Sequence, residues 1–118
     1  MAVAEVDEKT LAAQVVELAR MLGWRRYHTY RSKRSEPGWP DEALVRDRLV
    51  LLELKSTAGK LSAAQKTWLR SLVAAGVECY MIRPGDLQAL ASILALHNPA
   101  ADHIGVQVLR ERTLAEIA

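Results

Sequence analysis

Apolar residues recur along the chain with two different spacings, and each spacing predicts a kind of element. Leu11 begins a series with helical spacing, which predicts a helix over 7–22 that Gly23 ends. Alternation rich in aromatic residues predicts a strand over 24–31, and the Ser, Pro and Gly residues of 32–40 predict a loop. The chain is therefore expected to begin with a helix followed by a strand.

Two further strands are predicted over 42–46 and 49–55, joined by a tight turn near Asp47. The second strand is apolar on both faces until its last residues, which is typical of a central strand covered on both sides. In an antiparallel hairpin that turns near Asp47, residues whose numbers sum to about 94 face each other. Asp41 is therefore expected opposite Glu53.

The second half of the chain predicts a helix, a strand and another helix. Ser62 and Gln65 have the spacing of a capping box, so a helix is expected from there to about residue 75, closed by Gly76. An apolar strand is expected over 77–82. Asp86 is then expected to cap a helix that runs to about residue 97.

The predicted order is α-β-β-β-α-β-α, which defines an α/β fold with a mixed β-sheet flanked by helices. The strands before and after the helix at 62–75 should be parallel, because a strand–helix–strand unit crosses over and returns in the same direction. We expect a single domain over 1–118, with its core at about 7–97. The C-terminal tail at 98–118 should hold a short helix over 109–117.

Composition limits the kinds of protein that the chain can be. Its 118 residues suffice for one domain with a core of its own. Cys79 is the only cysteine, which excludes an internal disulfide and a multi-cysteine zinc site, and it is expected in the core together with Trp68. No apolar run reaches about 18 residues, the length of a membrane span, and the acidic start MAVAEVDEKT does not resemble a signal peptide. We therefore expect a cytoplasmic protein that does not bind membranes.

The net charge of +2 conceals a basic segment. Six Lys or Arg residues and no Asp or Glu lie between Leu18 and Ser35, and Trp, Tyr and His residues alternate with them over 24–30. Basic side chains with aromatic residues between them suit a phosphate backbone and exposed base or sugar faces. The same pattern suits a solvated strand edge that is protected by charge, so both interpretations stay open at this point.

Three charged residues lie at the end of the predicted hairpin that is remote from its turn. Asp41 begins one strand, and alternation places Glu53 and Lys55 on one face of the other. Burial of an acid and an amine is costly unless they pair or meet a metal. Two adjacent carboxylates attract a hard divalent cation such as Mg²⁺ or Mn²⁺, and the lysine would orient an attacking water or help to remove its proton. The alternative is a buried salt-bridge cluster without catalysis.

Glu8 lies at the border of the core-facing stripe of the first predicted helix. A carboxylate there can be a helix-start charge that the helix dipole favours. Alternatively, its side chain reaches inward to a functional site.

The ordered series of motifs resembles a known group of nucleases. Pro40-Asp41, then eleven residues, then Glu53-Leu54-Lys55 across a hairpin resembles the PD-(D/E)xK nuclease superfamily. More narrowly, the flanks look like the virus-type replication-repair nuclease (VRR-NUC) domain, over about residues 8–94. The motifs that carry this resemblance are Gly38-Trp39, Gly59-Lys60-Leu61-Ser62, Gln65-Lys66, Trp68-Leu69, Gly76 and Arg83-Pro84.

The resemblance implies a restriction-endonuclease-like core and a role for each matching residue. Lys55 would be the catalytic lysine, and Gln65 would face the site from its helix, although it also fits the capping box. Glu42 departs from the apolar residue that many members have here, and alternation directs it away from the site. The metal ligands that the resemblance implies are Asp41, Glu53, the backbone carbonyl of Leu54, and Glu8.

A nuclease site directly after the basic segment favours phosphate contacts from that segment. The DNA-binding candidates are Arg26, Tyr30, Arg31, Lys33, Arg34 and Lys60.

The function that the resemblance implies is a Mg²⁺- or Mn²⁺-dependent DNA endonuclease with no organic cofactor. Stand-alone members are similar to Holliday-junction resolvases, so a homodimer acting on branched DNA in a bacterial or phage-infected cell is expected, in DNA repair or recombination. A catalytically silent DNA-binding module of the same fold is the alternative from a different class. Among enzymes, a flap-directed or restriction-type nuclease stays open.

Overall fold

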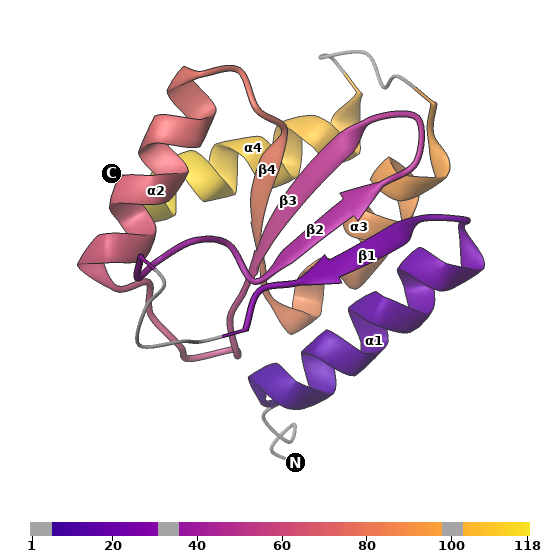
Figure 1. Cartoon of the computed structure of the whole chain (residues 1–118), viewed down its shortest axis with the longest axis horizontal. Helices are drawn as coiled ribbons and strands as arrows, with labels where there is room; N and C mark the ends of the chain where they lie inside the picture. The colour runs from indigo at the N-terminus through magenta and orange to yellow at the C-terminus, as the bar shows by residue number, and fades with distance from the viewer. Residues whose placement is uncertain (1–5, 31–35, 98–102) are drawn as a thin grey trace.

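A four-stranded mixed sheet forms the centre of the protein (Figure 1). The computed structural model describes residues 6–30, 36–97 and 103–118. The elements in chain order are α1 (Glu8–Met21), β1 (Arg25–His28), β2 (Glu42–Val45), β3 (Leu49–Leu54), α2 (Ala63–Ala74), β4 (Cys79–Ile82), a short 3-10 helix η1 (Pro84–Asp86), α3 (Leu87–Ala95) and α4 (Ile104–Ile117). The predicted α/β class, with a mixed sheet flanked by helices, is confirmed.

The strands lie in the order β1-β2-β3-β4, with β1 and β2 antiparallel, β2 and β3 antiparallel, and β3 and β4 parallel. Glu42 pairs with Leu52 and Val45 pairs with Leu49, so the facing residues sum to 94 as predicted. One further step along this register places Asp41 opposite Glu53. Beyond the paired strands, Thr29 N–H donates to the Asp41 carbonyl at 2.9 Å, which continues the β1–β2 ladder to the end of the hairpin.

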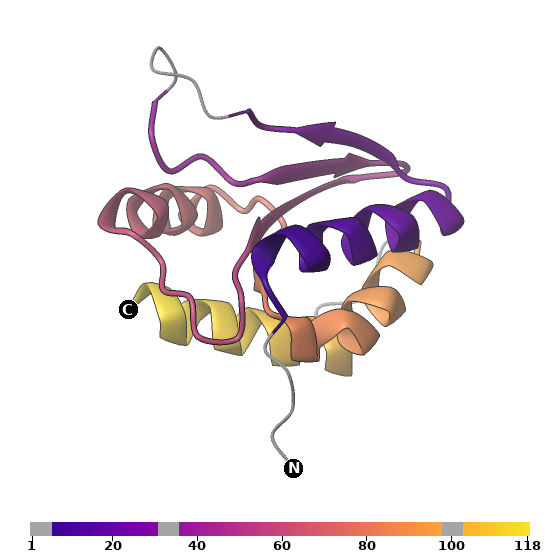
Figure 2. The ribbon, with the colours of Figure 1, turned by 90° about the horizontal axis from the view of Figure 1, so that it is seen from below.

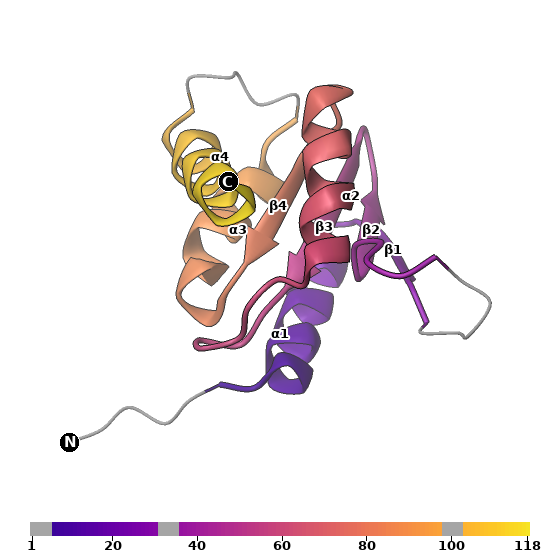
Figure 3. The same cartoon turned by 90° about the vertical axis from the view of Figure 1, so that its left-hand side faces the viewer.

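Helices cover the two faces of the sheet unequally. One face packs on α1, α3 and α4 through a large apolar cluster that includes Leu11, Leu52 and Leu109. The other face packs on α2 through a smaller cluster around Leu69 and Met81. Figure 3 shows α3 and α4 on one side of β4 and α2 on the other, and Figure 2 shows α1, α3 and α4 below the strands. The central strand β3 is therefore buried on both faces, as its apolar run predicts.

Local sequence signals account for most helix ends. The predicted capping box is present in α2, where Ser62 and Gln65 exchange side-chain to backbone hydrogen bonds. Gly23 has a φ of +84° and ends α1, with Trp24 N–H donating to the Ala19 carbonyl at 2.9 Å. Asp86 is the N-cap residue of α3, as predicted, but its side chain makes no hydrogen bond to the start of that helix. Its carboxylate accepts from Arg83 N–H at 2.6 Å instead.

The C-terminal helix is longer than the predicted 109–117 and packs against the edge strand β4. Thr113 Oγ1 accepts a hydrogen bond from Met81 N–H at 3.0 Å, and Arg112 donates to the Met81 carbonyl at 3.1 Å. These side chains use the backbone groups that an edge strand otherwise leaves free for another chain. The segment expected as a tail thus covers one edge of the sheet.

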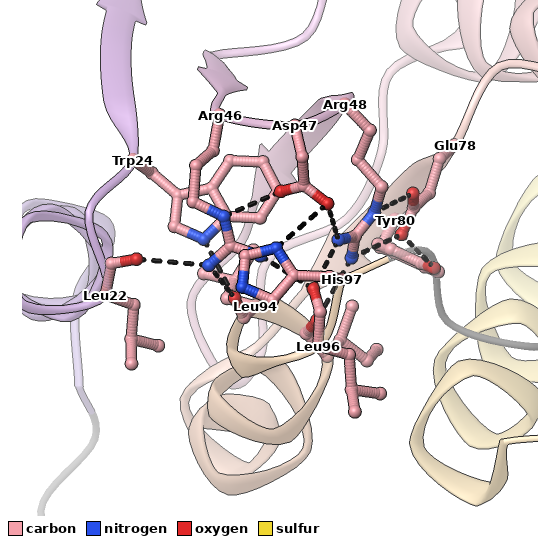
Figure 4. A network of polar contacts seen from close by, with 11 residues as sticks. Leu22, Trp24, Arg46, Asp47, Arg48, Glu78, Tyr80, Leu94, Leu96 and His97 are labelled. Atoms are coloured by element: carbon pink, nitrogen blue, oxygen red, sulfur yellow. Dashed lines mark hydrogen bonds and ion pairs between the residues drawn. The ribbon is translucent and has the colours of Figure 1, made fainter.

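A network of ion pairs and hydrogen bonds surrounds the β2–β3 turn (Figure 4). Arg46 and Arg48 lie on either side of Asp47, with their guanidinium carbons 4.5 and 5.1 Å from the Trp24 ring. Arg48 also pairs with Glu78 at 2.7 Å. The two arginines donate to carbonyl oxygens at the C-terminal ends of α1 and α3, namely those of Leu22, Ile93, Leu94 and Leu96. Cations at these helix ends are favoured by the helix dipoles and hold both helices against the hairpin.

Within the residues that the structure describes, no helix combines the length and the apolar character needed to cross a membrane.

Candidate active site

The end of the hairpin opposite its turn brings together the acids and the lysine that the sequence singles out. Asp41 directly precedes β2, and its Oδ2 accepts a hydrogen bond from Leu54 N–H at 2.9 Å. Glu53 lies on β3 with its side chain between Asp41 and α2, where Gln65 Nε2 donates to Oε1 at 2.8 Å. Lys55 follows β3, and its N–H donates to the Ile82 carbonyl at 2.9 Å. Backbone pairing on both sides of β3 therefore fixes the site.

Glu53 has the strongest electrostatic perturbation at this site. It is 1% exposed, and burial raises its pKa to about 9, with a further contribution from the negative charge of Asp41. Lys55 opposes the rise in this pKa. Glu53 Oε2 is buried and accepts no hydrogen bond from the described residues, and a hydrogen bond between the protonated Glu53 carboxyl and Asp41 adds to the raised pKa. When it is ionised, the carboxylate therefore has less compensation than a buried charge requires.

Lys55 is buried and faces the first helix. Its Nζ lies 3.5 Å from Oε1 of Glu8, whose side chain is about half exposed. The negative charge of Glu8 also contributes to the raised pKa of Glu53. Glu8 thus reaches inward to the site, as one of the two sequence interpretations expects, and its contact there is an ion pair with the lysine.

The donor set at Asp41 and Glu53 fits a hard divalent cation. A buried oxygen without a hydrogen-bond partner, on a carboxylate beside a second carboxylate, is a position where a cation would offset the cost of burial. Over 6–30, 36–97 and 103–118, no three His, Cys, Asp or Glu side chains gather closely enough to bind a metal ion by themselves. Asp41 and Glu53 could hold the cation, with water completing the shell, since Mg²⁺ usually retains several waters.

The loop before Asp41 is docked on the first turn of α2. Gly38 has a φ of +94°, and a Cβ built there would lie 2.5 Å from the carbonyl carbon of Ala64, so only glycine fits. Trp68 Nε1 donates to the Pro37 carbonyl at 3.1 Å, and its ring meets that of Trp39 edge-to-face at 5.0 Å. The prediction that Trp68 belongs to the core is therefore wrong: it is half-buried beneath this loop.

A cavity of about 460 Å³ opens beside the acids and the lysine. Asp41, Lys55 and Gln65 line its polar wall, and aromatic and basic side chains line the remainder. The further lining residues are Thr29, Tyr30, Glu36, Pro37, Gly38, Trp39, Lys60 and Ser62. Of these, Thr29 and Glu36 were not singled out by the sequence. Neither side chain belongs to a motif, and only the tertiary fold places them at the cavity.

The DNA-binding candidates have different surroundings. Tyr30, which is 78% exposed, and Lys60 both line the cavity. Arg26 lies in a bidentate ion pair with Glu42, at 2.7 Å for both contacts, and this pairing raises the pKa of the arginine. Glu42 is buried on the sheet face away from Glu53, as alternation predicts, and also contacts His28 at 3.0 Å. The candidates Arg31, Lys33 and Arg34 lie outside the described residues.

Comparisons of the chain with models of protein families, with curated proteins and with solved structures found no match.

Proposed function

We propose that the protein is a Mg²⁺- or Mn²⁺-dependent endonuclease that hydrolyses phosphodiester bonds in DNA. In this proposal the sheet is the core of a PD-(D/E)xK nuclease, similar to the VRR-NUC domain. One observation carries the proposal: the buried Glu53 carboxylate, with its raised pKa and an oxygen without a hydrogen-bond partner, lies beside Asp41 and two residues before a buried lysine. Glu53 contacts Gln65, which lines the cavity, and a perturbed ionisable group next to a cavity is typical of an active site.

Each side chain has a distinct part in the proposed hydrolysis. Gln65 holds one oxygen of Glu53, so the carboxylate keeps one orientation and presents its other oxygen to a cation. When bound, the cation would act as a Lewis acid that stabilises negative charge on the scissile phosphate. Lys55 would orient the attacking water and stabilise the charge that develops as its proton leaves. Glu8 would hold the Lys55 ammonium group in position, since its Oε1 lies 3.5 Å from Lys55 Nζ.

The acids and the cavity lining support DNA as the substrate. The cavity combines Lys55 and Lys60, which suit phosphates, with Tyr30 and Trp39, whose rings suit exposed bases or sugars. Homodimerisation and a preference for four-way junctions are further parts of the proposal, and they rest on the resemblance. Two sites related by a two-fold axis would suit paired nicks in strands of like polarity.

The test is a cleavage assay on four-way junction, flap, nicked, single-stranded and linear duplex DNA, with Mg²⁺ or Mn²⁺. Lys55→Ala and Glu53→Ala should each reduce the cleavage rate by roughly 10³-fold, because each removes a group that acts on the reacting atoms. DNA binding should survive in both variants. Glu17→Ala and Arg110→Ala serve as matched controls, because they remove an acid and a base from exposed helix positions.

Undiminished cleavage by either purified site variant would refute the assigned site. Binding by the unmodified protein without metal-dependent cleavage of any substrate would favour the silent DNA-binding module. Symmetric paired nicks in the junction would support the dimeric resolvase, and preferential cleavage of linear duplex would overturn that part of the proposal.

A further inference from the structure

Arg83 binds the loop that follows the proposed catalytic lysine. It is the first residue after β4, and its side chain is 17% exposed. Its Nη1 donates to the carbonyl oxygens of Ser56 at 2.6 Å, Thr57 at 3.3 Å and Gly59 at 2.7 Å. A single guanidinium nitrogen therefore donates hydrogen bonds to three carbonyl oxygens of one turn. We call this arrangement, Arg83 with residues 56–59, the arginine clamp.

The course of this loop determines where Lys55 and Lys60 lie. Lys55 precedes the clamped residues and Lys60 follows them, and both lysines line the cavity. Gly59 packs closely on the beginning of the loop: a Cβ built there would lie 2.9 Å from Ser56 Oγ and 3.5 Å from Lys55 Cδ. A change in the loop would therefore reach the methylene groups of Lys55 directly.

Arg83 is itself held at both ends. Its N–H donates to Asp86 Oδ2 at 2.6 Å, and Arg112 of α4 contacts the same oxygen. Its Nη2 lies 3.2 Å from Oε1 of Glu116, in the last turn of α4. The guanidinium plane is thus fixed by an acid from the C-terminal helix while its other nitrogen binds the loop. A planar group with several donors is needed for this, and lysine cannot supply it.

We propose that Arg83 is a positioning residue for the nuclease site: it fixes the loop over 56–59 and, through it, the side chains of Lys55 and Lys60. Glu116 completes the clamp and makes α4 a structural part of the site. This inference rests on the proposed function. Its experiment therefore includes a measurement that does not depend on cleavage.

The first measurement is amide hydrogen exchange, by NMR, in the metal-free protein. The Gly59 amide donates to the Ser56 carbonyl at 3.2 Å, so its protection reports on the closed turn. Arg83→Ala should increase exchange at residues 56–60 by at least about tenfold, because loss of the shared donor releases the turn. Glu116→Gln keeps an acceptor for Arg83 and should give a smaller increase. Arg70→Ala is the matched control, since Arg70 donates to the Ile117 carbonyl at 2.6 Å and makes no hydrogen bond to residues 56–59.

The second measurement is the single-turnover cleavage rate. Arg83→Ala should reduce it by on the order of 10²-fold, as expected when a reacting group is misplaced by about 1 Å. DNA affinity should change less than the rate does. Methylguanidinium added at tens of millimolar should bind in the vacated position and restore part of the rate in Arg83→Ala, with no such gain in Lys55→Ala or Arg70→Ala. Arg83→Lys should stay impaired, because it lacks the planar fork.

The outcomes distinguish the arginine clamp from the proposed nuclease function. Unchanged exchange at 56–60 in Arg83→Ala overturns the clamp, whatever the protein cleaves. Increased exchange together with an undiminished cleavage rate overturns its role in the site. Increased exchange in a protein that cleaves no DNA supports the clamp while the nuclease proposal fails. If Arg83→Ala does not fold, Glu116→Gln and Arg83→Lys decide by the same two measurements.

Discussion

The two ends of the β2–β3 hairpin both carry partly buried charges, and they balance them in opposite ways. At the turn, every strong charge has a partner: Arg46 binds Asp47, Arg48 binds Glu78, and the remaining donors reach helix carbonyls (Figure 4). At the other end, Glu53 lies beside Asp41 and keeps a buried oxygen without a partner among the described residues. The same pair of strands thus carries, at its turn, charges that all have partners and, about one strand length away, a buried acid that lacks one.

This difference indicates which end serves stability and which serves chemistry. A buried pair whose partners are all present is strongly destabilised when one partner is removed. A buried acid without compensation already destabilises the folded state, and such groups persist where a ligand or a reaction needs them. Removal of charge should therefore have opposite effects on the free energy of unfolding at the two ends.

The largest effect is expected at the turn. Arg48→Ala should lower the free energy of unfolding by about 4 kcal/mol, because it removes the partly buried ion pair with Glu78 and one donor from each of two helix carbonyls, those of Ile93 and Leu96. Urea denaturation at neutral pH measures this loss. Arg20→Ala is the control, since its ion pair with Glu17 is exposed and should change the free energy of unfolding little. A loss for Arg48→Ala as small as that of the control would contradict the assigned role of the network.

The next effect has the opposite sign and occurs at the candidate site. Glu53→Gln should raise the free energy of unfolding of the metal-free protein by on the order of 3 kcal/mol at pH 8, because burial first, and the charge of Asp41 second, make an ionised Glu53 unfavourable in the folded state, whereas the amide is neutral in both states. The amide keeps an oxygen that accepts from Gln65. The matched change at the turn, Glu78→Gln, should instead destabilise the protein, since Glu78 accepts from both Arg48 and Tyr80.

The pH dependence of this difference is set by the pKa of Glu53. The folded-state pKa of about 9 lies above the ordinary value of 4.5, so the folded protein holds this proton more tightly. The tighter proton binding of folded Glu53 contributes fully to the free energy of unfolding below about pH 4.5. This contribution is lost as the pH rises toward 9. The stability gain of Glu53→Gln should accordingly grow between pH 5 and pH 8, and Mg²⁺ or Mn²⁺ should reduce it by binding the unmodified protein. A gain independent of pH would show that Glu53 is not the uncompensated group.

Local sequence patterns predict the hairpin and the approach of its acids. Two-residue periodicity and the turn near Asp47 fix the register, and the register alone places Asp41 opposite Glu53. The capping box at Ser62 likewise predicts the helix start that brings Gln65 to Glu53. These parts of the site depend on contacts within a short stretch of chain.

Contacts between distant segments account for what the sequence does not predict. Trp68 has the spacing of a core residue, and only the docked loop at 36–40 shows that it packs on Trp39 instead. Asp86 has the position of a cap, yet Arg112, 26 residues away, contacts its carboxylate. Arg83 reaches carbonyls 24 to 27 residues earlier, and a carbonyl carries no side-chain signal in a sequence. Such long-range polar contacts require the fold itself.

The smallest expected effect concerns DNA affinity and compares cations near the two ends. Lys60 lines the cavity beside the acids, whereas Arg110 lines a separate cavity with Arg48 and Glu78, near the turn. Lys60→Ala should weaken DNA binding by about fivefold and reduce the slope of log affinity against log salt concentration by about one, as expected for the loss of one phosphate contact. Arg110→Ala removes the same charge from the chain and should change neither quantity.

Fluorescence anisotropy over a series of salt concentrations, with a labelled junction and Ca²⁺ in place of Mg²⁺, measures both the affinity and its salt dependence. If the two variants weaken binding equally, the net charge of the protein rather than the position of each charge governs the affinity. That result would contradict the proposal that DNA binds at the cavity beside Glu53.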